Sequence, residues 1–138
     1  AGGSGNVTAT HVAWKLDKDL SPDVNTPLVY KDLLYVLNGQ AGKRWLVCVD
    51  PKTGAEKWKG QLPGNSTYWA SPTAADGRLY CINEKSDVVV LEAGEQFKLL
   101  AAIPLGDSVC YSSIAIAHKQ LFIRTGQNLY CVGKQGDE

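Results

Sequence analysis

The sequence predicts an all-β protein made of about three blades of a β-propeller, each blade a four-stranded antiparallel sheet. The first observation is a repeat: Pro27 recurs as Pro72, 45 residues later, and Tyr35 recurs as Tyr80 at the same spacing. The second is that short extended runs alternate with Gly, Pro and Asp turn residues, while no window shows apolar residues at helical spacing. A period of about 42–45 residues with four short strands is typical of a propeller blade.

The other landmarks of the repeat keep this period. The run Leu46–Asp50 reappears as Leu129–Gly133, and Val88–Glu92 lies between the two copies. Ser113–Ile123 is a third copy of the run that opens each blade, 42 residues after the second. Chance matches would drift out of phase, so we interpret residues 1–138 as one partial propeller domain.

Each blade is expected to run from an inner hairpin to an outer hairpin. In the outer hairpin of the first blade, Val47–Val49 favours an extended backbone, Asp50 and Pro51 open a tight turn, and Gly54 tolerates positive φ. Trp58 then anchors the next strand. The expected strands are 26–30, 33–38, 44–49 and 55–59 in blade one (about 26–59); 68–75, 78–83, 88–92 and 97–103 in blade two (about 68–103); and 109–117, 120–125 and 128–132 in blade three (about 109–132).

The third blade lacks a fourth strand. Thr8–Leu16 alternates with Val12, Trp14 and Leu16 on one face, so we predict an outermost blade strand there. Either this strand or one missing from the chain would complete blade three and cover its edge. Three blades are fewer than the 4–8 of a closed ring, so we expect the other blades to come from the same polypeptide or from a second copy. The chain has no Met and ends in the polar run Gly133–Glu138, and we therefore expect it to be the C-terminal part of a larger propeller.

The composition narrows the partners. Lys and Arg total 14 and so do Asp and Glu, with no basic cluster, which disfavours nucleic acid as a partner. No long apolar run suggests a membrane span. The hydrophobic fraction of 44% is sufficient for a packed core.

The cysteines follow the repeat. Cys48 and Cys131 occupy the same register position, and Cys81 aligns with Val36 and Ile123 in the other blades. We interpret these thiols as small buried hydrophobes. No pair has the spacing of a zinc site, and cysteines in different blades do not suggest a disulfide framework. Cys110 lies near the start of an inner strand.

The polar residues suggest no catalytic cluster. His11 and His118 stand alone, and Asp residues fall at or beside turns in different blades, where their side chains bond the local backbone. We therefore predict no catalytic, cofactor-binding or metal-binding residues. Tyr68 and Trp69 precede the inner strand of blade two, where loops face one end of the ring. They either contact a ligand or partner, or pack between neighbouring blades.

One stretch carries a family resemblance. Cys48–Trp58 resembles the repeat of quinoprotein-type β-propellers, the pyrroloquinoline-quinone (PQQ)-like repeat: a small residue, any residue, Asp, two of any, Thr-Gly, three of any, Trp. The matching residues are Asp50, Thr53, Gly54 and Trp58.

The resemblance implies how blades dock. In that family the Trp packs against the turn of the next blade, so Trp58 and Trp14 would join neighbouring blades here. Blade two is degenerate, with a shortened turn at Val90–Gly94 and Leu100 in place of the Trp.

The resemblance also leaves two functions open. The first is a non-enzymatic scaffold that binds a protein or peptide, since the family includes a periplasmic lipoprotein of outer-membrane protein assembly. The second is part of a PQQ-dependent dehydrogenase, which would hold PQQ and calcium at the centre of the ring. Alcohol dehydrogenases of this family often carry two adjacent cysteines, which this chain lacks, and no calcium-type carboxylate cluster is evident. By resemblance, we expect a bacterial, exported protein in the periplasm or outside the cell.

Overall fold

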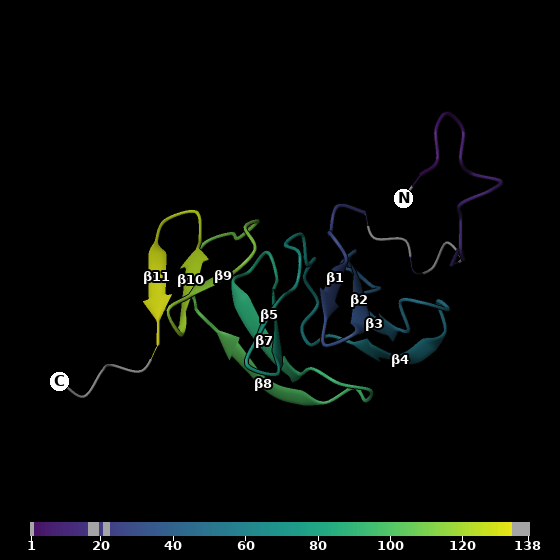
Figure 1. Ribbon diagram of the computed structural model, residues 1–138. Helices are drawn as coiled ribbons and strands as arrows, with labels where there is room; N and C mark the ends of the chain where they lie inside the picture. Colours follow the sequence, from purple (N-terminus) through teal and green to yellow (C-terminus); the bar gives the residue numbers. More distant parts are fainter. Residues whose placement is uncertain (1, 17–19, 21–22, 134–138) are drawn as a thin grey trace.

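The protein folds as three antiparallel β-sheets that follow one another along the chain (Figure 1). The structure is a computed structural model that describes residues 2–16, 20 and 23–133. Two sheets have four strands, in the orders β1-β2-β3-β4 and β5-β6-β7-β8, and the third has three, in the order β11-β10-β9. No α-helix occurs in the described part of the chain. The strands are β1 (Leu28–Tyr30), β2 (Leu33–Asn38), β3 (Trp45–Val49), β4 (Glu56–Gln61), β5 (Thr73–Ala75), β6 (Arg78–Ile82), β7 (Asp87–Glu92), β8 (Leu99–Pro104), β9 (Ala115–Ala117), β10 (Gln120–Arg124) and β11 (Leu129–Val132).

The order of strands confirms the predicted fold class of partial propeller blades. We refer to the sheets as blades one, two and three, each beginning at a short inner strand (β1, β5 or β9). The inner hairpins close with two-residue turns in which both residues have positive φ, the geometry that matches the twist of paired strands. These turns are Lys31-Asp32, Asp76-Gly77 and His118-Lys119.

The outer turn of blade one shows why its motif has this composition. Asp50 accepts backbone hydrogen bonds at Oδ1 from Lys52 (2.8 Å) and Thr53 (3.1 Å), which lowers the pKa of its carboxyl. Thr53 Oγ1 accepts from the Ala55 N–H at 3.2 Å. Gly54 has φ of 74°, a conformation that favours glycine, and its N–H donates to the Asp50 carbonyl. The turn is thus held by its own side chains.

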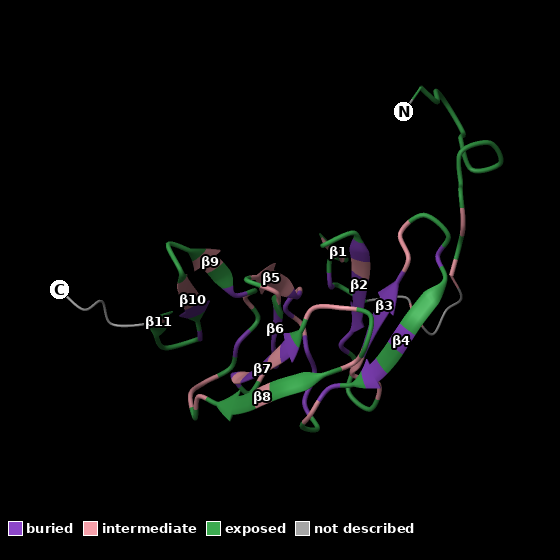
Figure 2. Cartoon of the chain, turned by 60° about the horizontal axis from the view of Figure 1, so that its bottom comes forward, coloured by how far each residue is buried: buried purple, intermediate pink, exposed green. Residues whose placement is uncertain are grey.

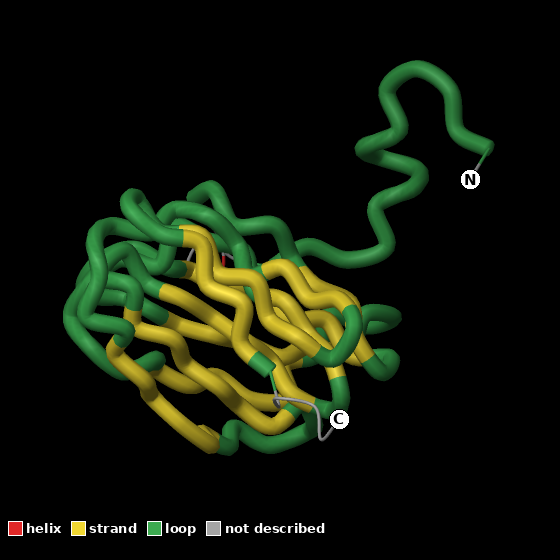
Figure 3. The backbone as a smooth tube through the Cα atoms, turned by 90° about the vertical axis from the view of Figure 1, so that its left-hand side faces the viewer, coloured by secondary structure: helices red, strands yellow, loops and turns green. Residues whose placement is uncertain are grey.

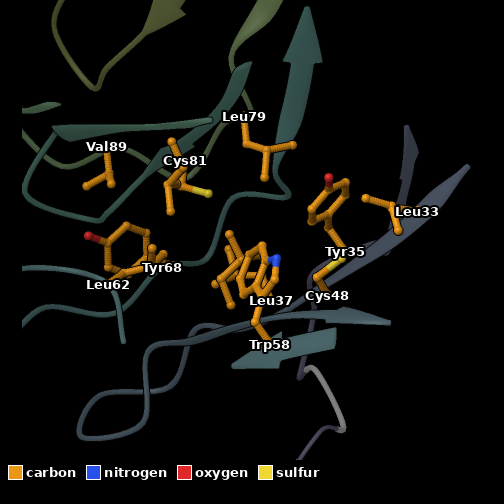
Figure 4. Close-up of a cluster of buried hydrophobic side chains, with 12 residues drawn as sticks. Leu33, Tyr35, Leu37, Cys48, Trp58, Leu62, Tyr68, Leu79, Cys81 and Val89 are labelled. Carbon is orange, nitrogen blue, oxygen red and sulfur yellow. The ribbon is translucent and has the colours of Figure 1, made fainter. Parts of the chain in front are cut away.

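The core lies between the blades rather than within one sheet. Figure 2 shows that buried residues gather in the middle strands, while β4 and β8 are largely exposed. Between blades one and two, Leu37 and Leu79 are fully buried and face a common cluster with Cys81 and Val89 (Figure 4). A second cluster between blades two and three includes Ile82 and Ile123. Each blade therefore depends on its neighbour to bury its apolar face.

The inner strands begin later than predicted. The expected runs 68–75 and 109–117 form strands only at Thr73–Ala75 and Ala115–Ala117. Residues ahead of them bond to neighbouring loops instead: the Tyr68 N–H donates to the Gly39 carbonyl at 2.8 Å, and Pro72 has no N–H to donate to a ladder.

The predicted strand over Thr8–Leu16 is wrong. Residues 8–10 form a turn in which the N–H groups of Thr10 and His11 donate to the Val7 carbonyl. The segment leaves the sheets and lies largely exposed (Figure 3). No described strand runs beside it, so its backbone has no ladder to join, and it does not complete blade three.

The predicted place of Leu100 is also wrong. The register pairs Cys48 with Trp58 in blade one and the equivalent Val90 with Ala101 in blade two. The turn of blade two is one residue longer than that of blade one, not shorter, since its closing pair is Leu91 and Leu99. Ala101 therefore takes the position of the Trp, and Leu100 lies exposed beside it.

Candidate binding surface at the loop end

Blades one and two are joined by an aromatic contact. Trp58 Nε1 donates to the Gly94 carbonyl in the outer turn of blade two at 2.8 Å. Its ring lies 5.5 Å from the Phe97 ring, edge to face. Phe97 in turn packs over Gly60, where a Cβ would lie 2.1 Å from the Phe97 ring. A bare backbone at Gly60 is therefore needed for this contact.

Trp14 makes the same kind of contact from the N-terminal segment. Its Nε1 donates to the Pro51 carbonyl in the outer turn of blade one at 3.0 Å. A Cβ at Gly54 would lie 2.8 Å from the Trp14 ring. Trp14 thus rests on the Asp-Pro-Lys-Thr-Gly turn as Trp58 rests on the next one, although no strand carries it.

Hydrogen bonds from backbone N–H groups to serine hydroxyls connect the loops that precede the inner strands of successive blades. The Thr26 N–H donates to Ser71 Oγ at 2.8 Å, and the Ser71 N–H donates to Ser113 Oγ at 3.0 Å. These three residues occupy one register position in successive blades. The buried amide of Asn25 adds two bonds to the Tyr68 and Ala70 carbonyls, at 2.9 and 2.8 Å. The loops that precede the inner strands are therefore held against one another.

These loops form one end of the molecule, which we call the loop end: residues 23–27, 39–44, 62–72, 83–86, 105–114 and 125–128. Bonds between its loops recur with the period, since Tyr68 N–H donates to Gly39 O as Cys110 N–H donates to Glu84 O. The loop end therefore has a fixed backbone on which exposed side chains can act as a surface.

One register position at the loop end carries large apolar or aromatic side chains in all three blades. Val24, Trp69 and Tyr111 occupy one register position in the three blades. Val24 is 59% exposed and Tyr111 is 63% exposed, while Trp69 is half-buried. Trp69 Nε1 donates to Glu84 Oε2 at 3.0 Å, which fixes the orientation of the indole. We name these three residues the loop-end triplet.

The two aromatic residues singled out in the sequence have different environments. Tyr68 has no exposed surface; its hydroxyl donates to the Pro63 carbonyl at 2.8 Å, and burial raises its pKa. It packs between blades one and two (Figure 4). Trp69 keeps an exposed portion. Sequence reasoning missed Val24 and Tyr111, although the period of the repeat already places both in register with Trp69.

A pocket of about 230 Å³ adjoins the loop-end triplet at Tyr111. Val109, Thr125 and Arg124 also line it. The pocket combines an aromatic ring, an apolar side chain and a cation, so it is suited to a side chain with an apolar body or to a carboxylate.

Beside this pocket, Asp107 holds the β10–β11 turn. Its Oδ2 accepts hydrogen bonds from Thr125 Oγ1 (2.9 Å), Asn128 Nδ2 (2.8 Å) and the Tyr130 hydroxyl. These donors hold the pKa of the Asp107 carboxyl well below its usual range, with the Tyr130 bond the largest cause. These bonds join the loop between β8 and β9 to the β10–β11 hairpin, so the cluster acts as a structural clasp.

The histidines and cysteines are dispersed. His11 lies in the exposed N-terminal segment, and His118 occupies a hairpin turn. Burial raises the pKa of the Cys48 thiol to about 11 and that of Cys81 to about 12. Cys131 is exposed, contrary to the buried position expected for it, because no described fourth strand or further sheet covers β11.

The side chains that commonly bind metal ions are dispersed in the described part of the chain. Within the described ranges, no group of three or more His, Cys, Asp and Glu side chains is placed to hold a metal ion. The thiols of Cys48, Cys81 and Cys110 are buried in separate positions rather than paired. Nor does that part of the chain contain a helix long and apolar enough to cross a membrane.

The solved structure of another propeller protein shares this geometry. A europium-containing methanol dehydrogenase matches 70% of this chain with a TM-score of 0.55 at 16% sequence identity. The chain has the fold of a partial β-propeller. BamB from Moraxella catarrhalis matches 73% of the chain with a TM-score of 0.49 at 12% identity.

The likeness covers only part of each of these two proteins. The chain spans 19% of the dehydrogenase and 40% of BamB. No protein-family model matches the sequence, and no curated protein does. At these identities the likeness concerns the fold alone.

Proposed function

We propose that this chain is part of a non-enzymatic propeller scaffold that binds a protein or peptide partner at the loop end. The observation that carries the proposal is the loop-end triplet: consecutive blades present Val24, Trp69 and Tyr111 at one register position on a hydrogen-bonded backbone. Aromatic residues on a rigid surface supply large contact areas at low entropic cost, and Trp and Tyr are enriched where binding energy concentrates.

The chemistry of the surface suggests the kind of partner. An apolar side chain of the partner would cover the exposed faces of Trp69 and Tyr111, and a partner carboxylate would reach the Arg124 guanidinium in the adjoining pocket. Binding would add little new order, because Trp69 is already oriented by Glu84.

The binding test is a selection from a phage-displayed library of random 12-residue peptides on the immobilised chain. We expect enriched peptides with an aromatic or aliphatic residue near an acidic one. Trp69→Ala and Tyr111→Ala should each weaken a selected peptide by at least about tenfold, measured by fluorescence anisotropy. Val29→Ala, at an exposed position on β1 outside the loop end, is the matched control. Selected peptides that bind the two alanine variants as tightly as the unchanged chain would refute the site.

The alternative is a fragment of a PQQ-dependent dehydrogenase. Adding PQQ with calcium should leave the thermal midpoint of this chain unchanged under the scaffold proposal. Specific binding would stabilise the fold by about 2.7 kcal/mol at a hundredfold excess over Kd. A saturable rise in the midpoint would favour the dehydrogenase instead.

The resemblance to the PQQ-like repeat supports an exported, bacterial protein in the periplasm or outside the cell, with further blades from the same polypeptide or a second copy. Fractionation of the native source, with antibody detection of this chain, tests the location. Recovery with cytoplasmic markers would contradict it.

A further inference from the structure

We propose that the outer edge of β8 accepts an extended apolar segment of a partner protein as an added strand. β8 is the outermost strand of blade two and, among the described strands, pairs only with β7. Its residues, Leu-Leu-Ala-Ala-Ile-Pro, carry no charge, and all except Ala101 are exposed. Leu99, Leu100 and Ile103 are 43%, 44% and 49% exposed. Large aliphatic side chains on an open strand edge are unusual in a soluble protein unless something binds there.

The comparison with β4 makes the feature specific to blade two. β4 holds the same outermost place in blade one, but its sequence begins with charged residues and carries Lys57 and Lys59. The register aligns Lys57 with Leu100 and Lys59 with Ala102. Lysines on an edge strand oppose the approach of another strand. Blade one thus protects its edge, and blade two leaves its edge free to pair.

A pocket at the end of this edge can hold one side chain of the added strand. It has a volume of about 210 Å³ and lies between the loop that enters blade two and strands β7 and β8. Its lining includes Pro63, Tyr68 and Val89, together with Ala102, Ile103 and Pro104 of β8. In strand addition, backbone bonds supply affinity while such pockets select side chains.

The pocket also indicates the charge of its occupant. Asp87 is the charged residue that lines it, and its Oδ2 accepts a hydrogen bond from the Asn83 side chain at 2.9 Å. The carboxylate favours a Lys or Arg beside the apolar residue that fills the pocket. The occupant is therefore an extended segment with alternating apolar residues and one basic residue at the pocket end.

The edge of β8 is distinct from the edge of β11. In blades one and two, a fourth strand pairs with the strand equivalent to β11. The open edge of β11 is therefore the place of a fourth strand of its own blade, not a site for a partner. Outer strands lie on the circumference of a propeller, so the β8 edge stays open whatever the number of blades. The β8 edge is also separate from the loop-end triplet, so an experiment can refute one of the two proposed sites and leave the other standing.

The test is a second peptide selection, in which 12-residue peptides that bind the chain are depleted on the double variant Leu100→Lys with Ala102→Lys. This variant gives β8 the two lysines of β4 at exposed positions. We expect peptides with alternating apolar residues and a basic residue, bound at least about tenfold more weakly by the double variant. N-methylation of one alternating set of peptide amides should abolish binding, and methylation of the other set should leave it intact, because an added strand uses one edge only.

The matched control adds lysines elsewhere, as Ala115→Lys with Ala117→Lys, both at exposed positions of β9 outside the loop end. It should bind the selected peptides as the unchanged chain does, with circular dichroism showing that both double variants are folded. Absence of enrichment, or equal loss with either N-methylated set, overturns the proposal. A second copy as the occupant would appear in light scattering as a dimer that the β8 lysines abolish, and that result would also overturn it.

Discussion

Strands β3 of blade one and β11 of blade three have the same sequence pattern but differ in exposure. Leu46 in β3 has no exposed surface, whereas its counterpart Leu129 in β11 is 71% exposed. Cys48 and Cys131 repeat the contrast, one buried and one exposed. Blade one has an outer strand, and blade two packs against its face, while neither covers β11 among the described residues. Burial in this fold is therefore a property of the neighbouring blade as much as of the residue.

The largest loss of stability should come from removing the Trp58 contact, which blade one makes with blade two and which blade three has no equivalent of among the described residues. Trp58→Ala removes the bond to the Gly94 carbonyl and the ring contacts with Phe97 and Tyr35, and should cost about 3–5 kcal/mol in urea unfolding. Trp14→Ala removes one bond from a half-buried ring and should cost about 1 kcal/mol. Equal losses would show that blade two does not depend on Trp58 for docking.

The next effect compares equivalent leucines directly. Leu46→Ala should destabilise the chain by about 2–5 kcal/mol, because it opens a cavity between blades one and two. Leu129→Ala should change the free energy of unfolding by no more than about 0.5 kcal/mol, because the side chain is largely in water already. Both changes in free energy are obtained from urea unfolding midpoints, with the same m-value for all variants. A Leu129 variant as damaging as the Leu46 variant would mean that another surface covers β11.

The smallest expected effect is a pH dependence of stability that comes from blade three. Tyr130 takes the register position of Val47, so blade three holds a polar clasp on Asp107 where blade one is apolar. The pKa of Asp107 is lowered in the folded state, so its stabilisation is present above the unfolded value, about 3.9, and is lost as pH falls through the folded value. The urea midpoint of Asp107→Asn should therefore lie below that of the unchanged chain at neutral pH and approach it under acid.

Asp76→Asn, at an exposed turn position of blade two, is the control for loss of one negative charge. The difference between its urea midpoint and that of the unchanged chain should not become smaller as the pH is lowered. A gap for Asp107→Asn that stays constant between neutral pH and strong acid would show that the carboxylate is not held by its partners.

The blades could be predicted from the sequence because each local signal agrees with the period. The run 33–38 is predicted and observed with the same bounds, since it is an almost entirely apolar run that the Lys31-Asp32 turn precedes and Gly39 follows. The same spacing implies the triplet member Tyr111, but spacing does not show which of two adjacent aromatic residues is exposed: Tyr68 is buried, whereas Trp69 keeps an exposed portion.

The errors arise where a contact, not a pattern, decides the structure. Residues 8–16 alternate like a strand, but a strand needs a partner backbone, and none lies beside them in the described chain. Ala101 could not be placed from spacing, because one extra turn residue shifts the register by one position. The exposure of Cys131 depends on what covers β11, which the residue itself does not encode.

Thiol labelling tests the central contrast most directly. The native chain, treated with N-ethylmaleimide at mildly alkaline pH and digested for mass spectrometry, should be modified rapidly at Cys131. Cys48 and Cys81 should react only after unfolding, because they are buried and their pKa values are raised to about 11 and about 12, which leaves little thiolate. Modification of Cys48 at the rate of Cys131 would contradict the account, since it would show that blade two does not cover blade one.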